Sequence, residues 1–373
     1  MNPETIRLLL LGLHNTTWQS LVMIAVGLLL IYLAISKEYE PLLLLPIGAG
    51  AVLANLPLSP LLGKEGALTI LYNVGVGTEL FPLLIFVGIG AMTDFGPLLE
   101  NPKMVLLGAA GQFGIFMTLI LALVLGFTHN QAASIGIIGA IDGPTSIYVS
   151  NKLAPDLVGP ITVAAYSYMS LVPIIMPPIM RLLTTKKERQ IRMPYSSREI
   201  SQRTRILFPI LVTIFVGTLV PFATPLIGML MLGNLMRESK VVERLTGAAE
   251  HEMTNVVTLF LGLAIGATMV GAKFLQVSTL LILILGLAAF CLDTVMGLLF
   301  GKLLNFFSGG KFNPLIGAAG ISAFPMAARV VQKEGQRADS DNFLLMHAMG
   351  ANAAGQVASV VAGGVLLALM GAR

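Results

Sequence analysis

The chain has 373 residues, of which 55% are hydrophobic and only 11% charged, and its mean hydropathy is +0.85. So few polar side chains cannot cover a water-soluble globule, and the composition predicts an all-α polytopic membrane protein. The single cysteine, Cys291, excludes disulfides within the chain and thiolate metal clusters, and the four histidines lack zinc-ligand spacing.

A basic segment divides the chain. Eight of the 23 Lys and Arg residues lie between Arg181 and Arg205, together with two acidic residues. The positive-inside rule places such a segment in the cytoplasm, so we expect a membrane repeat over residues 1–183, a cytoplasmic linker over 184–205 and a second repeat over 206–373. The segment has one aromatic residue, Tyr195, and lies between apolar stretches, which argues against nucleic-acid binding.

The first half alternates long and interrupted apolar segments. Residues 1–20 contain Glu4 and no small-residue cleavage site, so they predict an interfacial lead-in rather than a cleaved signal. Residues 18–36 and 103–127 are long enough to span a bilayer, whereas residues 41–57 contain glycines and are expected to be broken or closely packed. The remaining expected elements are a surface segment at 58–73, membrane segments at 79–95 and 157–183, and a hairpin at 131–152.

The second half repeats this order. Its expected elements are membrane segments at 206–222, 225–236, 254–271, 277–304 and 342–370, an amphipathic stretch at 237–252, and a hairpin at 313–333. The sequence therefore predicts about ten membrane elements and two re-entrant hairpins.

The hairpin at 131–152 places one carboxylate, Asp142, inside an apolar run. Asp142 lies about eleven residues into the run, which is roughly half the hydrocarbon thickness in a helix. Gly143 and Pro144 predict a helix break beside it, and freed backbone carbonyls survive in a membrane only inside protein or a wet cavity. A midplane acid at a broken helix is typical of an ion site, although a structurally paired Asp at a kink is the alternative.

The hairpin at 313–333 repeats the first hairpin. Residues 316–333 match residues 135–152 at an offset of 181, with Gly136 and Gly139 matching Gly317 and Gly320, and Pro144 matching Pro325. Two shorter matches occur in order at offsets of 179 and 176: residues 46–55 match 225–234, and residues 89–91 match 265–267. Matched segments at a nearly constant offset predict two inverted repeats of one membrane fold, whose broken hairpins meet near the bilayer midplane.

Oxygen-bearing residues in the two hairpins suit Na⁺, a hard cation that needs neither His nor Cys. Asp142 offers the charge, and Asn313 and Ser322 offer neutral oxygens, although Asn313 could equally cap a helix at Pro314 and Ser322 could serve in helix packing. Arg329 could hold a carboxylate and Tyr168 could hold or transfer a proton. The alternatives for these two residues are a snorkelling Arg and an interfacial Tyr.

Four long motifs carry a family resemblance. The stretches GAIDGPTSI, AYSYMSLVPIIMPPIM, GKLLNFFSGGKFNPLIGAAGISAFPMAARVVQK and NFLLMHAMGANAAGQ resemble the integral-membrane beta subunit of the sodium-pumping, biotin-dependent decarboxylases. That family acts on oxaloacetate, glutaconyl-CoA, methylmalonyl-CoA or malonate. The resemblance implies a metal site of Asp142, Asn313, Gly317 and Ser322, and it implies Tyr168 and Arg329, with Asp142, as catalytic or carboxybiotin-binding residues. Ile141 departs from the pattern, because a small residue is expected there.

The resemblance also implies the chemistry and the partners. The chain would decarboxylate carboxybiotin and couple the release of CO₂ to Na⁺ export across a bacterial or archaeal cytoplasmic (inner) membrane. It has no biotinylation motif, so carboxybiotin would come from a biotin carrier protein, in an oligomeric complex with a carboxyltransferase alpha subunit and a small gamma/delta membrane subunit. The main alternative is a sodium-coupled carboxylate symporter of similar inverted-repeat fold without catalysis, and a second is a purely structural membrane anchor.

Overall fold

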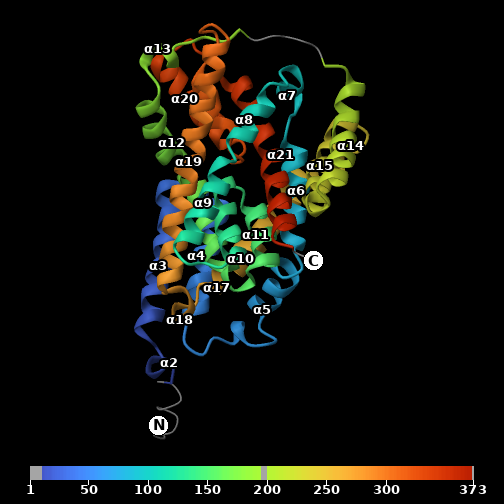
Figure 1. The fold of residues 1–373 in the computed structure, drawn as a ribbon. Coiled ribbons are helices and arrows are strands. Elements are labelled where there is room, and N and C mark those ends of the chain that lie inside the picture. Colours follow the sequence, from blue (N-terminus) through green and yellow to red (C-terminus); the bar gives the residue numbers. More distant parts are fainter. Residues whose placement is uncertain (1–10, 195–199, 372–373) are drawn as a thin grey trace, which may run out of the picture. The chain divides into compact units, whose positions relative to one another are not determined.

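Helices account for all the regular secondary structure in the residues that the structure, a computed structural model, describes: 11–194 and 200–371 (Figure 1). Six of these helices are long and apolar enough to span a bilayer, and a seventh span arises if Pro41–Asn55 and Pro60–Val76, bent by 103°, are counted as one. This confirms an all-α, multi-pass membrane protein. Shorter expected membrane elements, such as Thr224–Ser239, fall below the length of a full span, so the six or seven spans do not test the expected number of about ten membrane elements.

The chain divides into two compact units, each built from both halves of the sequence. One comprises the described residues up to Phe81 together with Asn255–Leu283, and the other comprises Pro82–Thr254 and the described residues from Ile284 onward. These units do not follow the expected boundaries at residues 183 and 206. The division into two repeats and a linker therefore stays a prediction, and residues 195–199 of the linker lie outside the described residues.

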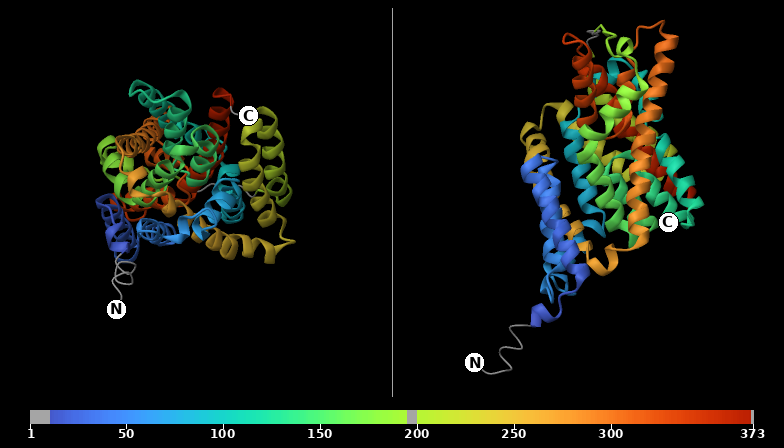
Figure 2. Two further views of the ribbon diagram at one scale, coloured as in Figure 1. Left: turned by 90° about the horizontal axis from the view of Figure 1, so that it is seen from below. Right: turned by 90° about the vertical axis from the view of Figure 1, so that its left-hand side faces the viewer.

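The smaller unit contains one long span and a group of shorter helices. Its elements are α2 (Leu11–His14), α3 (Trp18–Lys37), α4 (Pro41–Asn55), η1 (Pro60–Leu62), α5 (Ala67–Leu71), η2 (Tyr72–Val76), most of α17 (Thr254–Thr268), α18 (Gly271–Phe274) and the first turns of α19 (Val277–Phe307). Helices α3 and α4 run side by side (Figure 2). They approach so closely that a Cβ added at Gly27 would lie only 2.8 Å from the Gly48 carbonyl oxygen.

The larger unit holds the remaining elements. Before the linker these are most of α6 (Leu80–Met92), α7 (Gly96–Glu100), α8 (Met104–Ala110), α9 (Phe113–Val124), α10 (His129–Gly136), η3 (Ile137–Ala140), α11 (Gly143–Leu153), η4 (Pro155–Leu157), α12 (Val158–Leu183) and α13 (Lys186–Arg189). After it come α14 (Gln202–Leu219), η5 (Pro221–Ala223), α15 (Thr224–Ser239), α16 (Glu243–Ala248), η6 (Ala249–Met253), the rest of α19, η7 (Pro314–Gly320), α20 (Met326–Ala338) and α21 (Leu345–Leu369).

In the smaller unit, α4 of the first half packs against α17 of the second half. A Cβ added at Gly50 would lie 2.6 Å from the Leu263 carbonyl oxygen, so only glycine permits this approach. At the end of α4 the Asn55 amide donates to the Met269 carbonyl at 2.7 Å and accepts from the Gly271 N–H at 2.9 Å. Asn55 therefore ties the end of α4 to the end of α17.

In the larger unit, α15 of the second half packs in the same way against α6 of the first half. A Cβ added at Gly233 would lie 1.9 Å from the Val87 carbonyl oxygen, and the Asn234 amide donates to the Thr93 carbonyl at 2.9 Å. Asn234 is the sequence match of Asn55, and Ile89–Ala91 in α6 matches Ile265–Ala267 in α17. The matched segments thus have matched packing partners in the two units.

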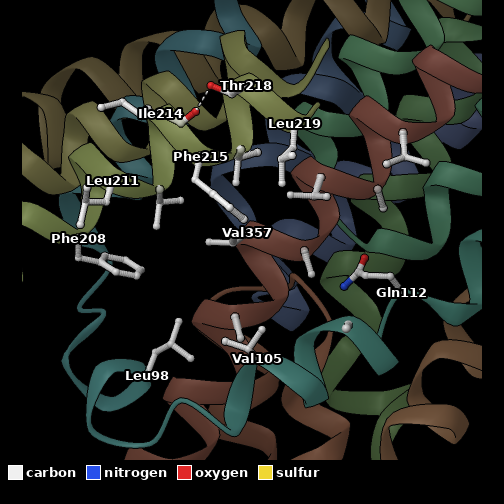
Figure 3. Close-up of a pocket in the computed structure, with 18 of the residues that line it drawn as sticks. Leu98, Val105, Gln112, Phe208, Leu211, Ile214, Phe215, Thr218, Leu219 and Val357 are labelled. Carbon is white, nitrogen blue, oxygen red and sulfur yellow. Dashed lines mark hydrogen bonds between the residues drawn. The ribbon is translucent and has the colours of Figure 1, made fainter. Parts of the chain in front are cut away.

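One large cavity in the larger unit is mostly apolar. It has a volume of about 1110 Å³ and is lined by α7, α8, α14 and α21. Phe208, Leu211 and Phe215 of α14 line it opposite Val105 of α8 and Val357 of α21 (Figure 3). The only polar side chains of its walls are Gln112, at the start of α9, and Thr218 of α14, whose hydroxyl donates to the Ile214 carbonyl at 2.7 Å. No charged group lines the cavity, so the charged part of the site must be sought elsewhere.

Candidate functional site

The first helix break lies at Ile141 and Asp142, where η3 ends and α11 begins. Asp142 is the N-cap of α11, and Gly143 and Pro144 open that helix rather than end the preceding one. Its side chain is buried and accepts hydrogen bonds from the Thr145 hydroxyl at 2.7 Å, the Ser359 hydroxyl at 2.8 Å and the Thr145 N–H at 3.3 Å. The carboxylate is thus held between the first hairpin and α21, which lies beside α11.

Ile141 has a positive φ of 52°, the left-handed conformation that β-branched residues rarely adopt. Glycine, which has no Cβ, would relieve this strain, so the backbone here favours the smallest side chain. Ile141 is also completely buried, so its side chain fills the space next to Asp142 without providing an oxygen ligand.

The second helix break follows η7 and meets the first. The Ser322 N–H donates to the Ala140 carbonyl at 3.2 Å, and the Ser322 hydroxyl donates to the Gly355 carbonyl of α21 at 2.8 Å. Ser322 therefore joins the two hairpins directly. Its hydroxyl oxygen, buried with only 3% of the residue exposed, still has lone-pair capacity for a cation.

Matched glycines let each hairpin approach neighbouring backbone. A Cβ added at Gly136 would lie 2.6 Å from the Ile115 carbonyl oxygen of α9, and one added at Gly317 would lie 1.9 Å from the Gly297 carbonyl oxygen of α19. Both positions therefore place a hairpin on the helix that precedes it in the sequence. Gly317 is thereby a packing glycine here, with its Cα against α19.

Three buried amides around the second break have oxygens without a partner. Asn352 donates its amide N–H to the Ile321 carbonyl at 2.6 Å, and Gln112 donates to the Gly108 carbonyl at 3.2 Å and more weakly to the Gly320 carbonyl at 3.4 Å. These bonds fix the amide orientation and leave Asn352 Oδ1 and Gln112 Oε1 unpartnered, as is Gln356 Oε1 one turn further along α21. Buried oxygens without donors are costly unless something binds them, and a desolvated cation is a suitable ligand.

These amides were missed by sequence reasoning. Asn352, Gln356 and Ser359 recur at intervals of four and three residues, so they lie on one face of a helix, and that spacing in GANAAGQVAS was the available signal. Polar residues on one helix face also occur in ordinary helix packing. The spacing therefore indicates a binding site only when the position of the hairpin that faces it is known.

Two tyrosines of α12 face different neighbours. Tyr166 is buried against the first break: a Cβ added at Gly143 would lie 2.7 Å from its hydroxyl oxygen, which has no hydrogen-bond partner, and its phenol interacts electrostatically with Asp142. Tyr168 faces α19 instead, near Gly286 and Cys291. Sequence reasoning selected Tyr168, whereas Tyr166 is the phenol at the Asp142 carboxylate.

Among the described residues, Asn313 and Arg329 form no side-chain hydrogen bond to the two breaks at Asp142 and Ser322. Asn313 is the N-cap of η7: its side-chain oxygen accepts from the Leu315 N–H at 3.0 Å, and its amide donates to the carbonyls of Arg189 and Ile191 at 3.1 and 2.8 Å. It thus fastens the start of η7 to the linker. Arg329 is exposed on α20, and its guanidinium has no ion pair among the described residues.

Asp293 of α19 is a second, completely buried carboxylate. One oxygen accepts a short hydrogen bond from the Gly114 N–H at the start of α9, and the other has no partner among the described residues. A Cβ added at Gly139 would lie 2.7 Å from that second oxygen. Asp293 therefore contacts the first hairpin from the side of α19, with one donor where Asp142 has three.

Comparison with known proteins decides the family. A sequence model described as "Na+-transporting oxaloacetate decarboxylase beta subunit" matches residues 19–370. The chain belongs to this family. It is 54% identical over 359 residues to the methylmalonyl-CoA decarboxylase subunit beta of Veillonella parvula, covering 96% of this chain and 95% of that protein. It is 50% identical to the oxaloacetate decarboxylase beta chain of Klebsiella pneumoniae and 52% identical to the glutaconyl-CoA decarboxylase subunit beta of Acidaminococcus fermentans, covering 96% or more of each protein.

Membership establishes the kind of protein. The chain is a beta subunit of a Na⁺-transporting decarboxylase, a multi-pass membrane component of a multi-subunit complex. Its relatives are named as decarboxylase subunits, and not as carboxylate symporters without catalysis. Their names differ in the substrate, so they leave open which carboxylic acid this complex consumes.

The position of Tyr166 gives a first prediction. Tyr166→Phe removes a hydroxyl beside Asp142 whose oxygen has no hydrogen-bond partner among the described residues and is free to contact a bound cation. We therefore expect the Na⁺ concentration for half-maximal decarboxylation to rise roughly tenfold, the order of magnitude of one lost contact to a charged group. Tyr168→Phe is the matched control, because Tyr168 lies against α19, and it should leave that concentration unchanged even if it slows turnover. Na⁺ titration of carboxybiotin decarboxylation in both variants measures this, and an unchanged Na⁺ dependence in Tyr166→Phe would rule the hydroxyl out of the cation site.

Proposed function

We propose that this chain decarboxylates carboxybiotin, delivered by a partner biotin carrier protein, and uses the released free energy to export Na⁺. The observation that carries the proposal is the junction of the two helix breaks, where Ser322 bonds to the Ala140 carbonyl and buried amide oxygens remain unpartnered around it. Family membership supports the reaction class, and the unpartnered oxygens at the junction support our proposal that the ion binds there.

For the cation we propose Asp142 as the charged ligand and Ser322 as a neutral one, with the amide oxygens of Asn352 and Gln356 completing the shell. Carboxylate, hydroxyl and amide oxygens are the ligands that hard cations prefer. We also propose Asn313 and Gly317 as members of the cation site, because the family resemblance implies this role for them. Because the Asn313 amide is bonded to the linker backbone in this structure, its participation requires those bonds to open.

For carboxybiotin we propose Arg329 and Tyr168 as binding residues, with Asp142 near the reacting group. The Arg329 guanidinium is exposed and unpaired among the described residues, so its fork of N–H donors is available to a carboxylate. In the reaction the bond between the carboxyl carbon and the ureido nitrogen breaks, CO₂ leaves, and the nitrogen takes up a proton, which Tyr168 could relay.

The architecture we propose is two inverted repeats whose broken hairpins, 131–152 and 313–333, enter the membrane without crossing it. Support comes from the matched contacts: Asn55 and Asn234 anchor corresponding helices, and Gly136 and Gly317 pack corresponding hairpins on corresponding spans. The linker 184–205 would face the cytoplasm of a bacterial or archaeal cell from its inner membrane. The expected partners are the carboxyltransferase alpha subunit, the biotin carrier and a small gamma/delta membrane subunit.

Coupling requires that Na⁺ and carboxybiotin favour different or successive states of one two-state element, since a ligand of equal affinity for both states shifts nothing. The hairpin junction is suited to this because it is held by few hydrogen bonds between separate segments, such as Ser359 to Asp142 and Ser322 to Ala140. Movement of the hairpins against the remaining helices would expose the site alternately to each side.

Avidin tests the dependence on biotin. Avidin sequesters the biotinyl group, so we expect it to abolish Na⁺ uptake by the reconstituted complex, and biotin-saturated avidin should have no effect. Na⁺ transport that continues with free avidin would show that carboxybiotin is not the driving substrate. It would favour a symporter mechanism instead.

A further inference from the structure

A second cavity, of about 680 Å³, lies at the end of the larger unit that carries α13 and the start of the linker (upper part of Figure 1). Its walls come from α7, linker residues 191–194, the end of α19, the loop 308–312 and the start of α21. The volume falls within the range of about 300–1,000 Å³ that is typical of small-molecule sites. The cavity adjoins η7, because Asn313, next to the lining residue Phe312, donates its N–H to Met193 Sδ at 3.4 Å.

An imidazole in this cavity has an unused polar atom. His347, at the start of α21, forms a hydrogen bond with the Met193 backbone, and its Nε2 is buried without a hydrogen-bond partner. Because the bonded ring nitrogen donates to the backbone, Nε2 of the neutral ring is an acceptor that is held in a fixed direction. A buried ring nitrogen that lines a cavity and is left unpaired indicates a ligand with a complementary polar group.

The charge of the cavity is predominantly positive. Lys103 and Lys311 line it, are exposed, and have no ion pair among the residues that the structure describes. The third cation, Arg192, is already held by Asp339 at 2.6 Å and Asp341 at 3.3 Å. Glu100 is the only acidic residue of the lining, and it interacts with His347. Two free ammonium groups thus remain available to an anion.

Apolar groups make up much of the remaining wall, including Phe307, Phe312 and Leu304. An apolar wall with two cations and one directed imidazole suits a compact ring that carries a carboxylate and a ureido N–H. We propose that this cavity receives the N-carboxylated biotin head group as the carrier presents it, before the group reaches Arg329, with Lys103 and Lys311 facing the carboxylate and His347 Nε2 accepting from the remaining ureido N–H. The inference rests on the proposed function, and the cavity is separate from Asp142, Arg329 and Tyr168, none of which lines it.

The test is steady-state kinetics of the whole reconstituted complex with carboxylated carrier protein as the varied substrate. In the double variant Lys103→Gln/Lys311→Gln we expect KM for the carrier to rise about tenfold, the loss expected of charge-assisted contacts, while kcat stays within about twofold. The conservative pair Lys103→Arg/Lys311→Arg should restore KM, because it keeps the charge. His347→Gln should raise KM for the carrier and weaken competitive inhibition by free biotin.

Lys186→Gln is the matched control, because Lys186 is an exposed lysine of α13 at the same end of the unit and does not line the cavity. Its KM should equal that of the wild type. An unchanged KM in the double variant, or an equal rise in Lys186→Gln, would overturn the proposal. Failure of the proposed function would look different, since carboxybiotin turnover would then be independent of Na⁺ already in the wild-type complex.

Discussion

Asp142→Asn is expected to abolish both Na⁺ transport and Na⁺-stimulated decarboxylation. Asparagine keeps the size of the side chain and can still accept from Thr145 or Ser359, but it removes the charge that attracts the cation. Removing one partner from a buried ion pair costs roughly 3–5 kcal/mol, so Na⁺ activation should weaken by at least about a hundredfold. Parallel assays of CO₂ release and ²²Na⁺ uptake across Na⁺ concentrations measure the effect.

Asp293→Asn is the control for this experiment. Asp293 is as deeply buried, but it has a single hydrogen-bond donor, the Gly114 N–H, which the amide oxygen of asparagine can still accept. We therefore expect this variant to keep measurable transport and decarboxylation. Na⁺ activation that survives in Asp142→Asn but is lost in Asp293→Asn would move the cation site from the hairpin junction to the contact between α9 and α19.

Arg329→Lys should impair decarboxylation although the charge is kept. A guanidinium binds a carboxylate through two parallel N–H donors, which a single ammonium cannot reproduce. A lost charge-assisted hydrogen bond of about 1.5–3 kcal/mol corresponds to a decrease of kcat/KM of roughly tenfold to a hundredfold. The Na⁺ concentration for half-maximal activation should stay unchanged, because the exposed Arg329 forms no side-chain hydrogen bond to Asp142 or Ser322 among the described residues.

The exposed position of Arg329 also allows a purely structural role, which predicts the opposite result for Arg329→Lys. An arginine that only snorkels along α20 would tolerate lysine, since both side chains have long apolar stems and a terminal charge. Wild-type kcat/KM in Arg329→Lys would therefore remove Arg329 from carboxybiotin binding and leave it a structural role. Lys333→Arg, an exposed cation one turn further along the same helix, controls for a general effect of changing basic residues on α20.

The pattern of glycine, proline and charge made part of this site predictable. Asp142 had to lie near a break because Gly143 and Pro144 follow it, and the matched offset of the hairpins suggested that Ser322 would lie opposite. The structure brings these two segments together through Ala140. Both features follow from local sequence, because glycine and proline act on the backbone where they stand.

Other parts of the site depend on packing that no local pattern encodes. Tyr166 and Tyr168 are two residues apart in one helix, so they point about 200° apart, and only the position of α12 decides which of them meets Asp142. The amide oxygens of Asn352 and Gln356 stand out only in the folded structure. There the Asn352 amide N–H donates to the Ile321 carbonyl, and no donor among the described residues bonds to either oxygen. The hydrogen bonds of Asn313 to the linker were likewise out of reach, since they join residues more than 120 positions apart.

The central claim is that decarboxylation by this chain drives Na⁺ across the membrane, and its most direct test is a coupled measurement in proteoliposomes. The purified complex is reconstituted with the linker facing outward, carboxylated carrier protein is added outside, and CO₂ release and ²²Na⁺ uptake are followed together. We predict that Na⁺ accumulates inside only while carboxybiotin is consumed, and that a Na⁺ ionophore abolishes accumulation while CO₂ release continues or accelerates. CO₂ release without Na⁺ uptake in sealed vesicles, or Na⁺ uptake driven by a carboxylate gradient without carboxybiotin, would contradict the account.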